Sequence, residues 1–228
     1  MHSTSFAQDW AVMTTHPFAF VFVIVGSVLW LGSYLLALVL GFKQKTYGLP
    51  LAAIMMNFTW EVIASFLRPA PFYFWHIGAY LWLILDVVIV GQVFWYGRAV
   101  QVIPEMKRWF YPVVVVALAG IFAGQFLFSR YIHDEFTYVF SYFINAVMSI
   151  LFIFRYFEIR DHGNAAYGVA VTKMFGTGII SIGLVFLWPV LYPGRTHFIF
   201  MKFMFVAVFL LDVLYVHVLR MGRQAATA

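Results

Sequence analysis

Long apolar stretches alternate with short polar connections along the whole chain. Windows of about 20 predominantly apolar residues recur seven times, each long enough to cross the ~30 Å hydrocarbon core of a bilayer as a helix. We therefore expect an all-α membrane protein whose residues 1–228 form a single domain of seven transmembrane helices. The predicted spans lie near residues 18–41, 48–67, 76–97, 110–129, 136–156, 167–190 and 197–219.

The composition agrees with this pattern. Hydrophobic residues make up 64% of the chain and charged residues only 10%, whereas soluble domains carry about 25% charged residues. The segment before the first span lacks Lys and Arg, and no small-residue cleavage site follows that span, so it is expected to be retained rather than removed as a signal peptide. The sequence thus predicts an integral membrane protein of a bacterial inner membrane or the endoplasmic reticulum.

The basic residues fall mainly on one side of the predicted topology. By the positive-inside rule, this bias places the N-terminus outside and the C-terminus in the cytoplasm. The net charge of +5 then reflects topology and faces anionic lipid headgroups, so nucleic acid is not an expected partner. The predicted cytoplasmic set is Lys43, Lys45, Arg98, Lys107, Arg108, Arg155, Arg160, Arg220 and Arg223, and the outer set is Arg68, Arg130 and Arg195.

A weak internal repeat relates the first three spans to the last three. The segment Leu-Ile-Leu-Asp86-Val-Val resembles Phe-Leu-Leu-Asp212-Val-Leu, and Tyr47-Gly48 before the second span matches Tyr167-Gly168 before the sixth. This pattern predicts a parallel three-plus-one-plus-three arrangement with the fourth span as a linker. Chance recurrence in so biased a composition is the alternative.

Three acidic residues lie inside predicted spans, namely Glu61, Asp86 and Asp212. A carboxylate inside a membrane span costs roughly 2.5–3.5 kcal/mol on insertion scales, so such residues normally face a protein-lined cavity and mark a proton or substrate site. Counted at 1.5 Å per residue, all three lie roughly 16–20 Å from the cytoplasmic ends of their helices. We expect them near the membrane midplane, at similar depth.

Aromatic residues form 21% of the chain. Most are expected in interfacial belts and lipid-facing packing, as for Trp10, Trp75, Trp95 and Trp109 near span ends. Others lie within spans and are candidates to line a cavity: Trp30, Tyr34, Trp60, Trp82, Tyr142, Trp188 and Tyr215. The histidines show no HExxH pattern and the chain has no cysteine, so no metal site is expected.

The run Gly41 to Gly48, the segment Asn57-Phe58-Thr59-Trp60-Glu61-Val62 and Pro69 resemble the integral-membrane terpene cyclases of indole-diterpene and meroterpenoid pathways, the paxilline-type cyclases. Members of that family have a similar length, seven predicted spans, an Asn-x-x-Trp-Glu segment in span two and an Asp in span seven. The matching positions here are Asn57, Trp60, Glu61 and Asp212. The chain departs from the family at Lys173, where the pattern has Arg, and the Asp86 position varies within the family.

The resemblance implies a non-ionising cyclisation, in which an acid protonates a terminal epoxide or alkene of a prenylated lipophilic substrate. We expect an epoxide, because protonating an isolated alkene demands a far stronger acid. Glu61 and Asp212 are the expected catalytic pair, without cofactor or metal, since the Asp-rich motifs of soluble cyclases are absent. The expected substrate-binding residues are Asn57, Trp60, Asp86, Trp30, Tyr34, Trp188 and Tyr215; the oligomeric state is left open.

A proton-coupled or small-solute transporter is the alternative function. Carriers also use midplane acids and repeated helix units. The chain lacks the Pro-Gln dipeptides of the PQ-loop carriers, which share the three-plus-one-plus-three plan. A seven-helix receptor, the third class, would require no paired acids.

Overall fold

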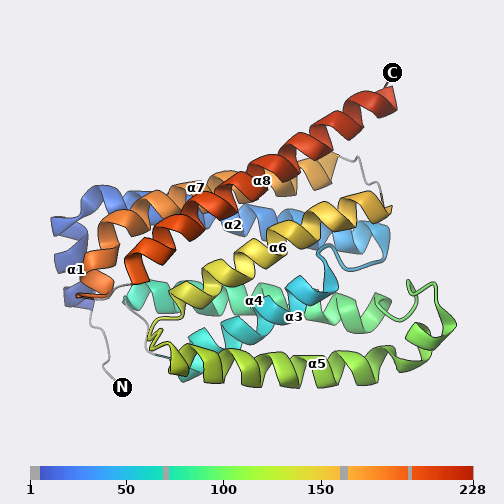
Figure 1. The fold of residues 1–228 in the computed structure, drawn as a ribbon, viewed down its shortest axis with the longest axis horizontal. Helices are drawn as coiled ribbons and strands as arrows, with labels where there is room; N and C mark the ends of the chain where they lie inside the picture. Colours follow the sequence, from blue (N-terminus) through green and yellow to red (C-terminus); the bar gives the residue numbers. More distant parts are fainter. Residues whose placement is uncertain (1–5, 69–71, 160–163, 195–196, 228) are drawn as a thin grey trace.

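The computed structural model describes residues 6–68, 72–159, 164–194 and 197–227, and every regular element in these ranges is a helix. Pro69, Arg160 and Arg195 lie outside the described residues. The long helices run up and down along one bundle axis, and α1 lies across one end (Figure 1). The elements are α1 (Phe6–Thr15), α2 (Pro17–Gln44), α3 (Leu51–Val62), the π-helical segment η1 (Ile63–Leu67), α4 (Tyr73–Tyr96), α5 (Pro104–Tyr131), α6 (Tyr138–Ile159), α7 (Asn164–Leu191) and α8 (His197–Thr227).

The all-helical membrane architecture predicted from the sequence is confirmed. Within the described residues, six helices are long and apolar enough to cross a membrane: α2, α4, α5, α6, α7 and α8. The second predicted span, 48–67, coincides with α3 and η1, which form a shorter apolar helix over Leu51–Leu67. Its first residues belong to the preceding loop, and the short helix α1 was not predicted.

Local sequence explains where several helices begin and end. Pro17 and Pro104 open α2 and α5, where a residue without a backbone N–H loses no helical hydrogen bond. Lys45 ends α2 in the left-handed conformation, with φ 52° and ψ 45°. Arg68 ends η1 in an extended conformation, as expected for a residue that precedes a proline.

Glycines bring α2 and α7 into close contact. A Cβ atom at Gly26 would lie 2.5 Å from Ile180 Cγ1 and 2.8 Å from the backbone oxygen of Gly176. A Cβ atom at Gly183 would lie 2.8 Å from the backbone oxygen of Ala19. Small residues at such contacts let helix backbones approach within a membrane, where dispersion rather than water exclusion drives association.

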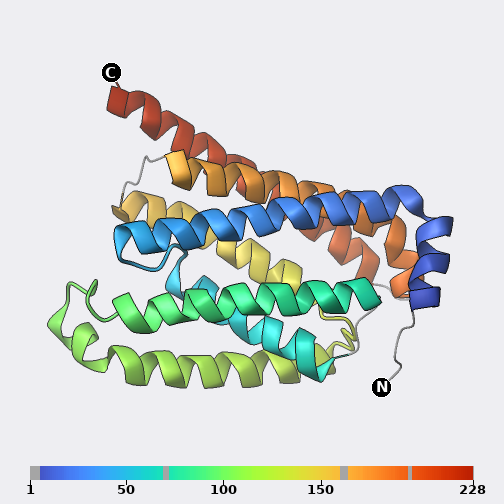
Figure 2. The ribbon, with the colours of Figure 1, turned by 180° about the vertical axis from the view of Figure 1, so that it is seen from behind.

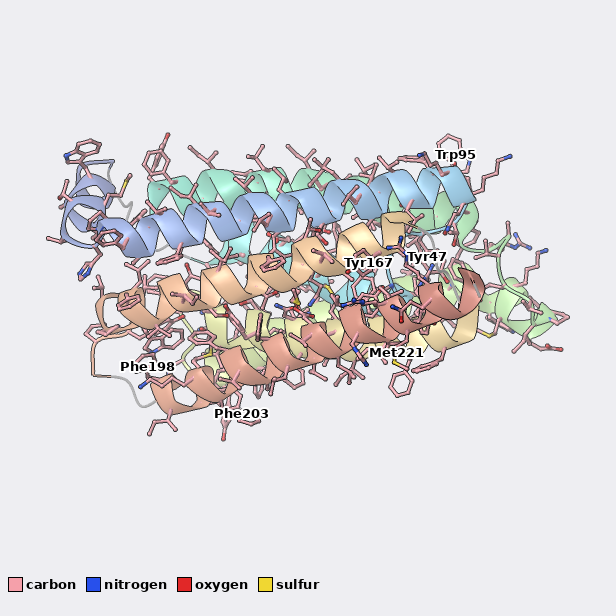
Figure 3. All side chains as sticks on the ribbon, turned by 90° about the horizontal axis from the view of Figure 1, so that it is seen from above. Tyr47, Trp95, Tyr167, Phe198, Phe203 and Met221 are labelled. Carbon is pink, nitrogen blue, oxygen red and sulfur yellow. The ribbon has the colours of Figure 1, made fainter. Side chains whose placement is uncertain are left out.

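The helix contacts follow one pattern in both halves of the chain. In the first half, α4 contacts both α2 and α3, and in the second half α8 contacts both α6 and α7. The contacts between the halves are α2 with α7 and α3 with α6, while α5 packs on α3. Tyr47 precedes α3, and Tyr167 lies in the first turn of α7. Both are at the same end of the bundle (Figure 3).

The close α2–α7 contact gives a test with opposite expected signs on one helix. Gly26→Ala should lower the free energy of unfolding by about 1–3 kcal/mol, because the new methyl group presses on backbone atoms of α7. Gly32→Ala should leave it unchanged or raise it by up to about 1 kcal/mol, since nothing lies within 4 Å and alanine favours a helix. Denaturant titration in detergent measures both variants. Equal destabilisation of the two would contradict the described packing.

Candidate active site

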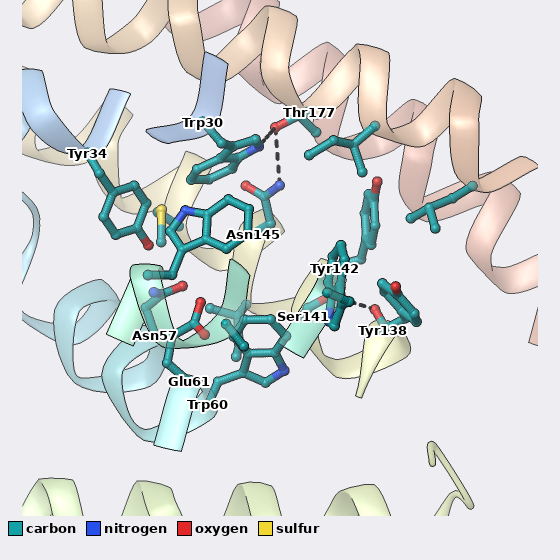
Figure 4. Close-up of a pocket in the computed structure, with 17 residues that line it drawn as sticks. Trp30, Tyr34, Asn57, Trp60, Glu61, Tyr138, Ser141, Tyr142, Asn145 and Thr177 are labelled. Atoms are coloured by element: carbon teal, nitrogen blue, oxygen red, sulfur yellow. Dashed lines mark hydrogen bonds between the residues drawn. The ribbon is translucent and has the colours of Figure 1, made fainter. Parts of the chain in front are cut away.

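A cavity lies between α2, α3, α4, α6 and α7, where the two halves of the chain meet. About 110 Å³ of it is open to the centres of water-sized spheres. Five of the residues predicted for the site line it together: Trp30, Tyr34, Asn57, Trp60 and Glu61. Figure 4 shows Asn57, Trp60 and Glu61 on one side of this space and Trp30, beside Asn145 and Thr177, on another.

Glu61 contributes the one carboxyl group among the described residues that line this cavity. Its side chain is only 3% exposed, and its Oε2 atom is buried without a hydrogen-bond partner in the described part of the chain. The helix widens immediately after it, because η1 begins at Ile63. Single π-helical turns of this kind often occur at functional sites.

Asn57, near Glu61 on α3, binds a second carboxyl group. It precedes Glu61 by one helical turn, so both side chains lie on the same face of α3. Asn57 Nδ2 donates a hydrogen bond of 2.7 Å to Asp86 Oδ2 on α4, and Asp86 is buried. The carboxyl groups of Glu61 and Asp86 are close enough to interact electrostatically. The structure therefore groups Glu61 with Asp86 rather than with Asp212.

Trp60 lines the same cavity although neighbouring helix positions point about 100° apart. Its indole Nε1 donates a hydrogen bond of 3.2 Å to the backbone oxygen of Thr137. This bond anchors the edge of the ring at the start of α6 and leaves the ring beside Glu61 (Figure 4).

Asp212 does not line this cavity but forms a buried ion pair. Lys173 Nζ lies 2.5 Å from Asp212 Oδ1, both side chains are 1% exposed, and Ser149 Oγ donates a bond of 2.7 Å to the same oxygen. Asp212 Oδ2 has no hydrogen-bond partner among the described residues. A lysine ammonium is a point charge, whereas the arginine of the family pattern could bind both carboxylate oxygens.

The ion pair reaches the cavity through Trp30. Lys173 Nζ lies 5.3 Å from the centroid of the Trp30 ring. Trp30 Nε1 donates to Thr177 Oγ1 at 3.2 Å, and Asn145 Nδ2 donates to the same oxygen at 3.3 Å. The Trp30 ring is therefore in contact with a cation and bonded at its edge to a hydroxyl group.

Trp188 and Tyr215 lie elsewhere in the core. Trp188 stacks on Tyr192 with ring centroids 4.5 Å apart, and Tyr215 packs on Phe152 with centroids 5.2 Å apart. Neither lines the cavity that contains Glu61. Their positions within predicted spans gave no information on which neighbouring helix they would face.

Several lining residues were not predicted. Trp75, assigned from its position near a span end to the interfacial belt, lines the cavity together with Tyr138 and Ser141. Asn145 and Thr177 carried a signal that could have found them, because each is a polar residue inside an apolar span. In the described ranges, no group of three or more His, Cys, Asp or Glu side chains is placed to hold a metal ion.

A family model of Pyr4-like transmembrane terpene cyclases matches residues 7–225. The chain belongs to this family. The resemblance predicted from the sequence is thereby confirmed, and membership indicates an enzyme embedded in a membrane.

Two similar cyclases show how far this one has diverged. It is 23% identical over 194 residues to terpene cyclase cle7 of Aspergillus versicolor, covering 82% of this chain and 79% of the relative. It is 26% identical over 187 residues to terpene cyclase macJ of Penicillium terrestre, covering 76% and 69%. No solved structure matches this terpene cyclase family member at a significant level.

The buried ion pair predicts a strong coupling between Lys173 and Asp212. Lys173→Met should lower the free energy of unfolding by about 3–5 kcal/mol, because it leaves a buried carboxylate without its cation. Asp212→Leu should lower the free energy of unfolding to a similar extent, because it leaves the buried ammonium group without its carboxylate. The double variant Lys173→Met/Asp212→Leu should recover most of the loss, since no unpaired charge remains. A double-mutant cycle of denaturant titrations in detergent measures this, and additive losses would contradict the pairing.

Proposed function

We propose that this protein is a terpene cyclase that isomerises a prenylated, epoxidised lipophilic substrate by proton-initiated cyclisation, with Glu61 as the proton donor. Membership of the Pyr4-like family supports the reaction class. The observation that carries the residue assignment is the buried Glu61 carboxyl, which lines a cavity and has an oxygen without a hydrogen-bond partner in the described chain.

The surroundings of Glu61 suit a proton donor. It forms no ion pair with a described residue, and a carboxyl group in apolar surroundings without a cation favours its neutral form. In the proposed step, the Glu61 proton moves to the epoxide oxygen as a C–O bond opens. An internal alkene then attacks the electron-poor carbon, and loss of a proton from the last cation gives a product of unchanged mass.

Asn57 and Asp86 are proposed to assist at the same position. After donation, Glu61 carries a negative charge that needs a nearby hydrogen-bond or proton donor. Asn57 lies one turn away, and through it Asp86 is connected to the site. Two carboxyl groups this close tend to share a proton, so the pair is suited to take part in both the first and the last proton transfer.

Aromatic walls are proposed to stabilise the intermediate cations. Trp30, Tyr34 and Trp60 line the cavity, and indole or phenol faces attract a cation without forming a bond to it. An apolar cavity also keeps water from capturing the cation early. Lys173 already lies over the Trp30 ring, and this positive charge would weaken the attraction of the ring for a second cation. We therefore propose that Asp212, expected as half of the catalytic pair, acts as a positioning residue that neutralises Lys173.

The finer architecture is part of the proposal. We propose that α3 with η1 makes a seventh crossing, with the N-terminus outside and the C-terminus in the cytoplasm of an inner or endoplasmic reticulum membrane. The matched contacts of α2, α3 and α4 with those of α6, α7 and α8 support a parallel three-plus-one-plus-three repeat around α5. Asp86 and Asp212 occupy corresponding positions, and each bonds to the second helix of its own half.

Small-solute transporters also use repeated helix units. Turnover in detergent separates the cyclase from the transporter, because only an enzyme converts a substrate without a membrane gradient. Purified protein is incubated with a farnesylated phenol that carries a terminal epoxide, in the presence of EDTA and without a membrane gradient. The expected product is a cyclised isomer of identical mass. In D₂O it should contain no new carbon-bound deuterium, because the proton goes to oxygen, whereas alkene protonation would introduce one deuterium.

Glu61→Gln should reduce turnover by at least about 10³-fold, because the amide has no proton of comparable acidity to donate. The matched control is Glu105→Gln, the same change at an exposed position in the first turn of α5, and it should keep wild-type turnover. Helicity and elution as a single species in detergent check that both variants are folded. Wild-type turnover in a folded Glu61→Gln variant would exclude Glu61 as the donor.

A further inference from the structure

A second apolar hollow lies beside the cavity, between α2 and α4. It offers about 220 Å³ to the centres of water-sized spheres, twice the space of the cavity that contains Glu61. Its walls come mainly from the N-terminal halves of α2 and α4. Ile24 and Val28 on α2, and Gly78 and Leu81 on α4, are representative of this lining, which we call the α2–α4 groove.

The groove and the cavity share a wall. Trp75, Trp82, Tyr138 and Leu184 line both spaces. The rings of Trp75 and Trp82 have centroids 6.3 Å apart, and those of Trp75 and Tyr138 5.0 Å apart. The groove and the cavity are therefore neighbouring spaces divided by shared, mainly aromatic side chains.

The groove opens toward the bilayer. Val28 is 61% exposed and Leu81 52% exposed, and both lie on helices that are candidates to span the membrane. Figure 2 shows α2 and α4 on one face of the bundle, with α1 folded across their ends. Since α1 contacts both α2 and α4, that end of the groove is covered. The open direction is sideways, into hydrocarbon.

The chemistry of the groove matches an isoprenoid chain. Its lining is almost entirely aliphatic or aromatic, with the Ser27 hydroxyl as a small exception. Gly78 has no side chain, and a Cβ there would meet only Trp82, at 3.3 Å from Cζ3. Because Gly78 has no side chain, the groove stays open next to Trp82, which also lines the cavity. A hydrated solute would gain no hydrogen bonds here, whereas a prenyl tail loses nothing on leaving the bilayer.

We propose that the α2–α4 groove is the lateral passage and tail-binding site through which the prenyl chain of the substrate enters the cavity from the bilayer. This inference deepens the proposed cyclase function and rests on it for the identity of the substrate. The Trp75–Trp82 pair forms the inner end of the passage, at the wall of the Glu61 cavity.

Two pairs of substitutions test the passage kinetically. Val28→Trp fills the groove from α2, and Gly78→Leu fills it from α4; each should lower kcat/KM by about tenfold or more, chiefly through KM. Two substitutions serve as controls. Leu35→Trp changes a residue two turns further along the exposed face of α2, and Gly91→Leu changes a residue of α4 at which an added Cβ would have no atom within 4 Å. Both controls should keep wild-type kinetics. Equal effects of groove and control substitutions would overturn the proposal.

A readout without turnover separates this inference from the proposed reaction. A farnesyl ether bearing a diazirine on its chain is photolysed with the wild-type protein in phospholipid nanodiscs, and labelled peptides are mapped by mass spectrometry. We expect labels on the segments around Val28 and Leu81, removed by excess epoxyfarnesyl phenol and reduced in Val28→Trp. Labelling without turnover would support the lateral passage and reject the proposed cyclisation. Turnover without labelling here, or labelling that only added phospholipid suppresses, would overturn the passage.

Discussion

The structure depends on how buried charge is handled inside an apolar bundle. An ionised group in hydrocarbon is costly, and two of the buried carboxyl groups of this chain, Asp212 and Glu61, have contrasting surroundings. Asp212 is neutralised by Lys173 at 2.5 Å and held by Ser149. Glu61 forms no ion pair with a described residue and lines the cavity. The first arrangement suits a fixed charge in the core, and the second suits a group that exchanges a proton with a substrate.

The fold brings both arrangements close to Trp30. α3 is short, lies between α4, α5 and α6, and carries Glu61 into the space where the two halves meet. α7 packs against α2 through glycines and carries Lys173 to 5.3 Å from the centroid of the Trp30 ring. A substrate cation in the cavity would therefore meet an indole ring that already contacts a neutralised ion pair. This geometry supports the different roles proposed for the two acids, although the sequence presents them alike.

The sequence predicted the helices well and the site in part, for physical reasons. Hydropathy located the long spans because membrane crossing sets a minimum apolar length, but it extended the second span into the loop before Leu51. Asn57, Trp60 and Glu61 were found because their spacing is local to one helix. The partnership of Asp212 with Lys173 joins α8 to α7 and has no local signature. Trp75 was assigned to the interface because linear position does not reveal which way a side chain faces.

Glu61 is proposed to carry a proton at neutral pH in the membrane. Infrared spectroscopy with ¹³C-labelled glutamate tests it directly, since a protonated carboxylic acid has a carbonyl stretch distinct from the carboxylate bands. The wild-type protein in lipid at pH 7 should show an isotope-shifted protonated-acid band that Glu61→Gln removes. A wild-type spectrum without that band, or a band that persists unchanged in Glu61→Gln, would contradict the account.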